Sequence, residues 1–177
     1  LGNILQPSQI LTSEELLLRN APTIGETLAN ELGVSSTYFG PGASRPVIRG
    51  LAGSRVTMLS DRTSTMDASA VSPDHAVAVE MLLADEIEII RGPTTILYGS
   101  NAAGGIVNVI DSRIPKTIAE EPIAGAVEVR GDTAAEERAI VGRLDGGLSN
   151  LAWHVEGYDR DTNNIDKRVA VESGIGV

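Results

Sequence analysis

The sequence has 177 residues, a mass of 18.5 kDa and a formal net charge of −10, from 14 Lys and Arg against 24 Asp and Glu. This length favours one domain with room for a small addition. The acidity argues against a nucleic-acid binder, because neutralising phosphates requires clustered Lys and Arg. The absence of cysteine excludes a disulfide framework, a thiolate metal site and a cysteine nucleophile.

Two short helices are predicted at the start of the chain. Residues 13–19 begin with a serine and two glutamates, and acidic residues in a first turn suit the positive end of a helix. Ile24, Leu28 and Leu32 are spaced to share one face of a second helix, which is expected to continue to Leu32. Thr23 is the candidate N-cap of this helix, with a glutamate three residues later at the capping-box position.

Short strands and one long loop are predicted before residue 115. The strand segments are rich in β-branched residues and are Pro46–Leu51, Arg55–Leu59, Ile87–Arg91 and Ile106–Ile110. Residues 60–76 are polar and acidic and are expected to form a long exposed loop, a type of segment that often carries function. The apolar run over residues 77–84 is a candidate short helix.

Amphipathic strands are predicted after residue 122. Polar and apolar residues alternate in Gly125–Arg130, Arg138–Leu144 and Leu151–Tyr158. Such strands suit a sheet with one solvated face or a membrane barrel. Residues 145–147, an Asp-Gly-Gly run, are expected to form a turn, and His154 and Glu156 are expected to face one side of a strand as a polar pair. Because an isolated hairpin is marginally stable, these strands are expected to open a larger structure.

Two segments carry a resemblance to a known family. In the first, TIGETL (residues 23–28) precedes RPVIRGL (residues 45–51) and RVTML (residues 55–59). In the second, IEIIRGPTTILYGS (residues 87–100) precedes AGGIVNVI (residues 103–110). In this order and spacing, the segments resemble the plug domain of TonB-dependent outer-membrane receptors, most closely the zinc-uptake branch.

The resemblance implies an α+β fold. A small mixed-sheet plug domain with short helices is expected over residues 1–115, followed over residues 116–177 by a linker and the first amphipathic strands of an incomplete transmembrane β-barrel. The plug motif residues are Gly50, Gly92, Pro93, Tyr98, Gly99, Gly104 and Gly105. Its glycines permit sharp turns and close backbone approach, and its proline fixes φ where a strand ends. The sequence departs from the family at residues 61–62, where Asp-Arg replaces the usual Asp-Gly and puts a tight turn in doubt.

Two pairs of residues are candidate sites. The resemblance implies that Arg49 and Arg91 form a plug–barrel lock with glutamates of the inner barrel wall; a surface arginine on an edge strand is the alternative. In the zinc-uptake branch an adjacent Asp-His pair on a plug loop ligates zinc, and Asp74 and His75 match it. Carboxylate and imidazole are suitable zinc ligands, but the remaining ligands would come from the barrel. A solvated loop with a locally hydrogen-bonded histidine is the alternative.

The resemblance implies a plug that gates energy-coupled uptake of a scarce nutrient, a metal ion such as zinc, with no required cofactor and zinc as the transported substrate. A receptor for a ferric siderophore, haem or cobalamin is the alternative within the family, and a free-standing soluble periplasmic binding domain is the alternative outside it. The implied partners are the protein's own β-barrel, outer-membrane lipid, and TonB with its inner-membrane energising complex, through a TonB box expected outside this chain. The implied location is the outer membrane of a Gram-negative bacterium. No catalytic residues are proposed, since no Ser-His-Asp arrangement or phosphate-binding loop is recognisable.

Overall fold

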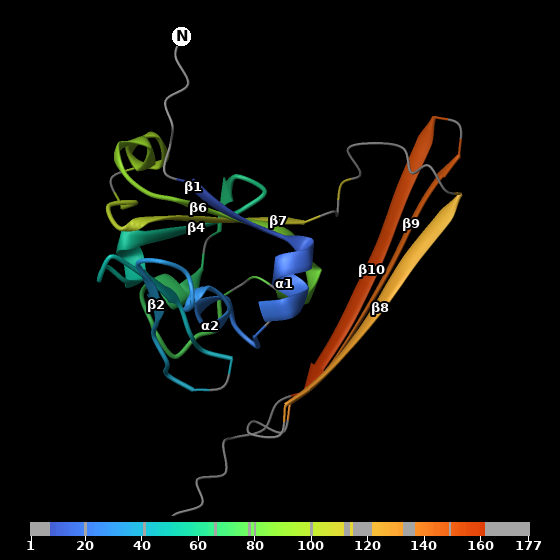
Figure 1. Ribbon diagram of the computed structural model, residues 1–177, viewed down its shortest axis with the longest axis horizontal. Helices are drawn as coiled ribbons and strands as arrows, with labels where there is room; N and C mark the ends of the chain where they lie inside the picture. The colour runs from blue at the N-terminus through green and yellow to red at the C-terminus, as the bar shows by residue number, and fades with distance from the viewer. Residues whose placement is uncertain are drawn as a thin grey trace, which may run out of the picture.

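The computed structural model describes residues 8–161 except residues 20, 41, 66, 78, 80, 100, 112–113, 115–121, 133–136 and 149. It contains two parts, which Figure 1 shows side by side. We call residues 8–111 the first domain and strands β8–β10 the second sheet. The linker predicted from residue 116 lies outside the described residues, apart from Pro122.

A five-stranded mixed sheet forms the centre of the first domain. Its strand order is β1-β6-β7-β4-β5. The strands are β1 (Ser8–Thr12), β4 (Val56–Ser60), β5 (Thr63–Ser64), β6 (Ala84–Ile90) and β7 (Gly105–Asp111). Strands β4 and β7 are parallel, and every other neighbouring pair is antiparallel. The β-branched runs of the sequence thus became the two central strands, β6 and β7, which supply much of the core.

Short helices and a hairpin complete the first domain. They are α1 (Ser13–Arg19), α2 (Ile24–Leu28) and the antiparallel pair β2 (Val34–Ser36) and β3 (Pro46–Ile48). Four 3-10 helices are η1 (Gly53–Arg55), η2 (Ala68–Ala70), η3 (Met81–Leu83) and η4 (Pro93–Tyr98). The main core cluster joins Leu11 and Leu16 to Ile24, Ile87 and Val107. One apolar core therefore unites β1, α1 and α2 with the central strands.

The first predicted helix is confirmed, whereas the second is shorter than predicted. Thr23 caps α2 as expected, accepting a hydrogen bond from the backbone N–H of Glu26. The helix ends at Leu28, and Leu32 is 84% exposed instead of continuing the buried face. The reason is Glu31, which turns inward and is buried where the helix would otherwise continue. A polar partner in the tertiary structure thus overrides the apolar spacing.

Two other segments differ from prediction. In the segment predicted as a helix over residues 77–84, of which all but residues 78 and 80 are described, the structure has the short η3, and the last residue already belongs to β6. Strand β1 was not predicted at all, since residues 8–12 carry only a short apolar pattern.

The tight turn doubted at residues 61–62 does form, with both Asp61 and Arg62 at positive φ. The side chain of Asn108 accepts the Arg62 backbone N–H at 2.8 Å, which supports this turn without glycine.

The second sheet consists of three long antiparallel strands. They are β8 (Ile123–Asp132), β9 (Glu137–Leu148) and β10 (Leu151–Asp161), in the order β10-β9-β8. The turn predicted at residues 145–147 is wrong, because these residues lie inside β9. Gly146 pairs with Trp153, whose ring lies where a side chain at position 146 would be. This glycine therefore makes room for an aromatic ring and does not mark a turn.

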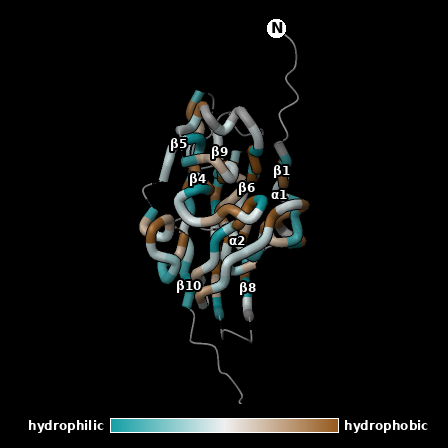
Figure 2. The backbone as a smooth tube through the Cα atoms, turned by 90° about the vertical axis from the view of Figure 1, so that its left-hand side faces the viewer, coloured by the Kyte–Doolittle hydropathy of each residue, from teal (hydrophilic) through white to brown (hydrophobic). Residues whose placement is uncertain are grey.

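Within the described ranges, no helix is long and apolar enough to cross a membrane. Figure 2 shows hydrophobic and hydrophilic residues interspersed along the backbone.

Candidate functional site

Arg49 occupies a tight turn and not the strand in which it was predicted. Strand β3 ends at Ile48, and the backbones of Ile48 and Leu51 exchange two hydrogen bonds of 2.9 Å across residues 49–50. Both turn residues have positive φ, 52° at Arg49 and 79° at Gly50. This is the backbone pattern of a two-residue hairpin turn, in which glycine at the second position is favoured. The exposed Arg49 side chain is thus presented at a turn.

Arg91 lies directly after β6, close enough to Arg49 for their charges to interact. Its Nη2 donates a hydrogen bond of 3.0 Å to Oε1 of Gln9 on β1. Burial lowers the pKa of Arg91, the like charge of Arg49 lowers it further, and the carboxylate of Glu31 opposes both effects. The structure therefore brings the two predicted arginines near each other. Their predicted glutamate partners on a barrel wall are not tested by the described residues.

Glu31 is the anionic centre of this cluster. Its side chain is 6% exposed and accepts hydrogen bonds from Arg19 of α1 and from the side-chain amide of Gln9. Gln9 therefore binds Glu31 with its nitrogen and Arg91 with its oxygen. We call Gln9, Arg19, Glu31 and Arg91 the Glu31 network. The network joins β1, α1, the turn after α2 and the end of β6.

The motif glycines are needed where backbones approach closely. A Cβ on Gly104 would lie 2.9 Å from Cβ of Leu51, and a Cβ on Gly105 would lie 3.1 Å from the carbonyl oxygen of Ile90. Gly105 also has φ of 151°. Gly92 and Gly99 have positive φ as well, and the 3-10 helix η4 between them contains Pro93 and Tyr98. The motif thus allows β7 to begin in close contact with β3 and β6.

Asp74 and His75 contact each other on an exposed segment. Oδ1 of Asp74 lies 3.0 Å from Nδ1 of His75, and the two side chains are 51% and 55% exposed, respectively. A hydrogen bond from Ser72 lowers the pKa of Asp74, and the contact with His75 adds to this effect. In the part of the chain that the structure describes, no group of three or more metal-ligating side chains is found. The pair therefore offers at most two ligands of a zinc site.

The loop around this pair is more anchored than predicted. The guanidinium of Arg45 and the carboxylate of Asp67 are both nearly fully buried and lie 3.8 Å apart. Asp67 also caps η2 by accepting the backbone N–H of Ser69 at 2.8 Å, and the Ser69 hydroxyl accepts a hydrogen bond from Arg45. The prediction of an exposed loop over residues 60–76 is thus wrong for its middle, because a buried ion pair fixes that part to the domain.

The second sheet has two chemically different faces. Every second residue of a strand lies on the same face of the sheet. One face carries four aliphatic side chains that are each at least half exposed, those of Val127, Val129, Leu144 and Val155. We call this the open face. The opposite face, which we call the docked face, carries most of the charged side chains of the strands. The predicted polar pair lies there, with His154 between Glu156 at 3.1 Å and Asp145 at 2.6 Å.

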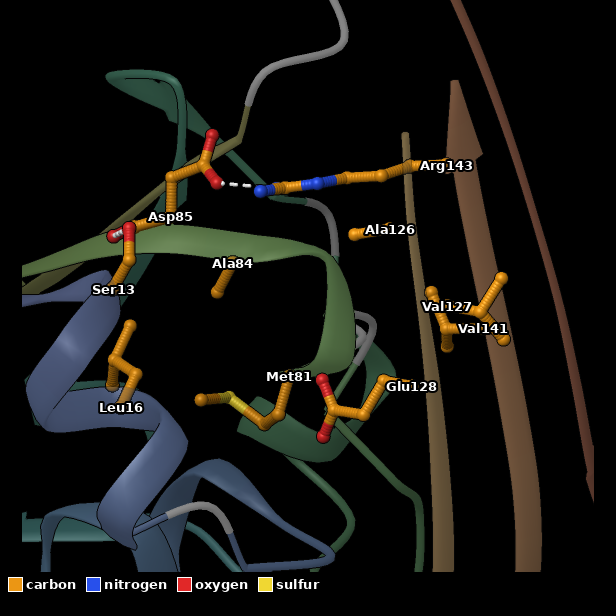
Figure 3. A pocket seen from close by; sticks show the side chains of 10 residues that line it. All are labelled: Ser13, Leu16, Met81, Ala84, Asp85, Ala126, Val127, Glu128, Val141 and Arg143. Carbon is orange, nitrogen blue, oxygen red and sulfur yellow. Dashed lines mark hydrogen bonds and ion pairs between the residues drawn. The ribbon is translucent and has the colours of Figure 1, made fainter. Parts of the chain in front are cut away.

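The docked face binds the first domain through two arginines. Arg143 of β9 forms an ion pair of 2.8 Å with Asp85 at the start of β6, and Arg130 of β8 donates a hydrogen bond of 3.2 Å to the carbonyl oxygen of Ala21. A cavity of about 230 Å³ lies beside the Arg143–Asp85 pair, and Figure 3 shows the side chains that line it. Leu16 and Met81 line it from the first domain, and side chains of β8 and β9 line the other side. The contact is thus partly polar and incompletely filled.

Sequence reasoning missed the Glu31 network and the docking arginines. The sequence around Glu31 and Gln9 is polar, and its pattern does not indicate whether these side chains are buried or exposed. A signal for the docking arginines was present, since Arg130 and Arg143 fall on the polar side of strands whose other side is apolar. Their partners could not be inferred, because no local pattern relates β9 to the start of β6.

Comparisons with known proteins identify the first domain. Residues 1–106 match the family described as TonB-dependent Receptor Plug Domain. The chain is 28% identical over 152 residues to the vitamin B12 transporter BtuB of Photobacterium profundum, an alignment that covers 85% of this chain and 24% of that protein.

Solved structures of similar fold agree with this match. The siderophore receptor PirA of Acinetobacter baumannii has a TM-score of 0.73 at 22% identity, over 97% of this chain and 27% of that one. A variant of the ferric enterobactin receptor PfeA of Pseudomonas aeruginosa has a TM-score of 0.71 at 23% identity, over 91% and 25%. The chain thus spans about a quarter of the length of these relatives.

Proposed function

The chain belongs to the TonB-dependent receptor plug domain family, and from this premise we propose that it is the plug and the first wall strands of a transporter driven by TonB. Receptors of this family are outer-membrane proteins of Gram-negative bacteria, and this is the location of the chain. In the proposed mechanism, the first domain closes the lumen of a barrel. TonB, energised from the inner membrane, then loosens it from the N-terminal side.

The two-faced second sheet is the observation that carries this proposal. Its open face exposes aliphatic side chains, as expected of a surface that contacts lipid. Its docked face binds the plug through Arg143 and Arg130. A free-standing soluble domain would leave this apolar face in water without compensation. The exposed apolar face of β8–β10 thus supports the proposal that the described part of residues 116–177 belongs to a barrel wall.

Arg49 and Arg91 are the proposed plug–barrel lock. Arg91 interacts with the charges of Arg49 and of Glu31, and Glu31 is already bound by Arg19 and Gln9. A guanidinium has five donors and pairs well with carboxylates. Glutamates of the remaining wall are thus suitable partners for both arginines. Arg49→Gln and Arg91→Gln together are expected to weaken the contact between plug and wall in the full-length protein.

A metal chelate or a corrinoid is the proposed substrate class. The relatives described above are named for vitamin B12, for siderophores and for ferric enterobactin. Zinc itself is a second candidate, and it rests on Asp74 and His75 alone. The exposed side chains of this pair are available to a ligand, but the rest of a zinc site would have to come from outside the described residues.

Uptake by the full-length protein tests both proposals. Cells that lack their own receptors and express the protein are expected to take up labelled cobalamin or a ferric siderophore, and to lose uptake when TonB is deleted. Uptake that persists without TonB would contradict the proposed mechanism. Zinc-dependent growth that is lost in the double variant Asp74→Ala and His75→Ala would favour zinc, whereas unchanged growth would remove that candidate and leave the plug assignment intact.

A further inference from the structure

The Glu31 network connects the first two elements of the chain to the arginine at the end of β6. The side chains that donate hydrogen bonds to Glu31 belong to these first elements, since Gln9 lies on β1 and Arg19 on α1. Arg91 also donates a hydrogen bond to Gln9. Glu31 and Arg91 are therefore each held by the N-terminal segment, and only one amide group lies between them.

The position of β1 makes its release geometrically simple. It is the edge strand of the five-stranded sheet and pairs with β6 alone (Figure 1). Helix α1 follows it directly along the chain. The segment is held by the β1–β6 ladder, by the buried side chains of Leu11 and Leu16 and by a hydrogen bond from the Ser13 hydroxyl to the carbonyl oxygen of Asp85. Release therefore has a cost, because it breaks this ladder and exposes both leucines.

Release of this segment would leave a buried carboxylate without partners. Glu31 would lose both of its hydrogen bonds, and removing one partner of a buried ion pair is strongly destabilising. Arg91 would lose Gln9 in the same step and would remain next to the carboxylate. The guanidinium of Arg91 already interacts with the charge of Glu31 across the amide. A direct pair between them would satisfy both groups.

We propose that Glu31 is the acceptor of an exchangeable ion pair, which binds side chains of β1 and α1 while these elements are docked and binds Arg91 once they leave. Gln9 is then a positioning residue that keeps the carboxylate and the guanidinium apart. The exchange lowers the free-energy cost of releasing the N-terminal segment and stabilises the remaining plug. The role of this exchange in opening the plug rests on the proposed function, in which the chain is pulled from its N-terminal side.

Hydrogen exchange of the β1 amides in the purified full-length protein measures this release without TonB or transport. If Arg91 stabilises the released state, Arg91→Gln slows β1 exchange, by about fivefold for an ion pair of ordinary strength. In the Glu31→Gln background the same substitution is expected to give no slowing. A residue that merely held β1 through Gln9 would give faster exchange in both backgrounds, and this result would overturn the proposal.

Two further variants keep the test decisive. Gln9→Met keeps the size of the side chain but removes both hydrogen bonds of the docked state, so β1 exchange is expected to accelerate by about fivefold. Arg55→Gln is the control, because Arg55 is an exposed arginine of η1 that belongs neither to the Glu31 network nor to the proposed lock. It is expected to cause no slowing. Slowing by Arg55→Gln but not by Arg91→Gln, or unchanged exchange in Gln9→Met, would refute the exchange. TonB-dependent uptake is measured separately in cells, so the two proposals can fail independently.

Discussion

The first domain buries its apolar side chains in a core, whereas the second sheet exposes apolar side chains on one face. In the first domain, the isoleucines of β6 at positions 87 and 89 are fully buried between neighbouring elements. In the second sheet, Val127 and Val129 are each 74% exposed on the open face. The first domain therefore has a core of its own, whereas the second sheet requires a surrounding that its own strands do not supply. The two parts therefore differ as the proposed plug and wall would, and the predictions below test this difference.

The start of β7 is expected to give the largest effect. Gly105→Ala would place a side chain at φ of 151° and bring its Cβ to 3.1 Å from the carbonyl oxygen of Ile90. Backbone strain and overpacking together are expected to destabilise the first domain by about 4 kcal/mol. Hydrogen exchange of the β6 and β7 amides in the full-length protein measures this loss. Gly40→Ala is the control, since nothing lies within 4 Å of its added Cβ; an equal loss in both variants would contradict the close-approach explanation.

Paired truncations in the two parts are expected to differ sharply. Ile87→Ala removes a fully buried side chain and is expected to cost about 3 kcal/mol of stability, through lost burial and the cavity that remains. Val127→Ala removes an exposed side chain, so its cost in detergent is expected to be within about 0.5 kcal/mol. Thermal unfolding of the two full-length variants provides the comparison. A large loss from Val127→Ala would show that the open face is covered by protein.

These two parts also show how far sequence reasoning reaches. Strands β6 and β7 were predicted because their β-branched runs fit buried strands, and the alternation in residues 125–130 identified a two-faced strand. Both are local patterns. The failures depend on contacts between elements: Glu31 turns inward to meet Gln9 and Arg19, which ends α2 early, and Gly146 lies inside β9, where the ring of Trp153 on the neighbouring strand covers it.

The candidate site was predicted unevenly for the same reason. The positions of Arg49 and Arg91 followed from motifs, but their surroundings did not, because Gln9 reaches Arg91 from a strand that shows no clear pattern. Arg49 was assigned to a strand because it lies within Pro46–Leu51, a segment with β-branched residues. Only the glycine at position 50 indicated that residues 49–50 would have positive φ. Motifs therefore located the charged groups, while tertiary structure determined their partners.

The contact between the two parts is expected to give a smaller effect. Arg143→Gln removes the 2.8 Å ion pair with Asp85, whose members are both partly exposed. Such pairs contribute at most about 1 kcal/mol. The second sheet should therefore remain docked but with faster hydrogen exchange at the start of β6. Arg138→Gln is a suitable control, because Arg138 is an exposed arginine of the same strand. Complete separation of the two parts would mean that the ion pair dominates the contact.

The smallest effect is expected at the exposed pair of residues 74 and 75. Hydrogen bonds from Ser72 and then His75 lower the pKa of the Asp74 carboxyl. A lowered folded-state pKa contributes stability above the unfolded pKa, and this contribution is lost as pH falls through the folded value. Because the group is exposed, the effect on stability should be too small to detect. The pKa itself should respond: Ser72→Ala removes the largest cause, so NMR titration is expected to show the carboxyl titrating at higher pH than in the parent protein. An unchanged titration would show that the Ser72 hydroxyl does not hold the Asp74 carboxylate in solution. The carboxylate could then turn toward a zinc ion whose other ligands come from the proposed barrel wall.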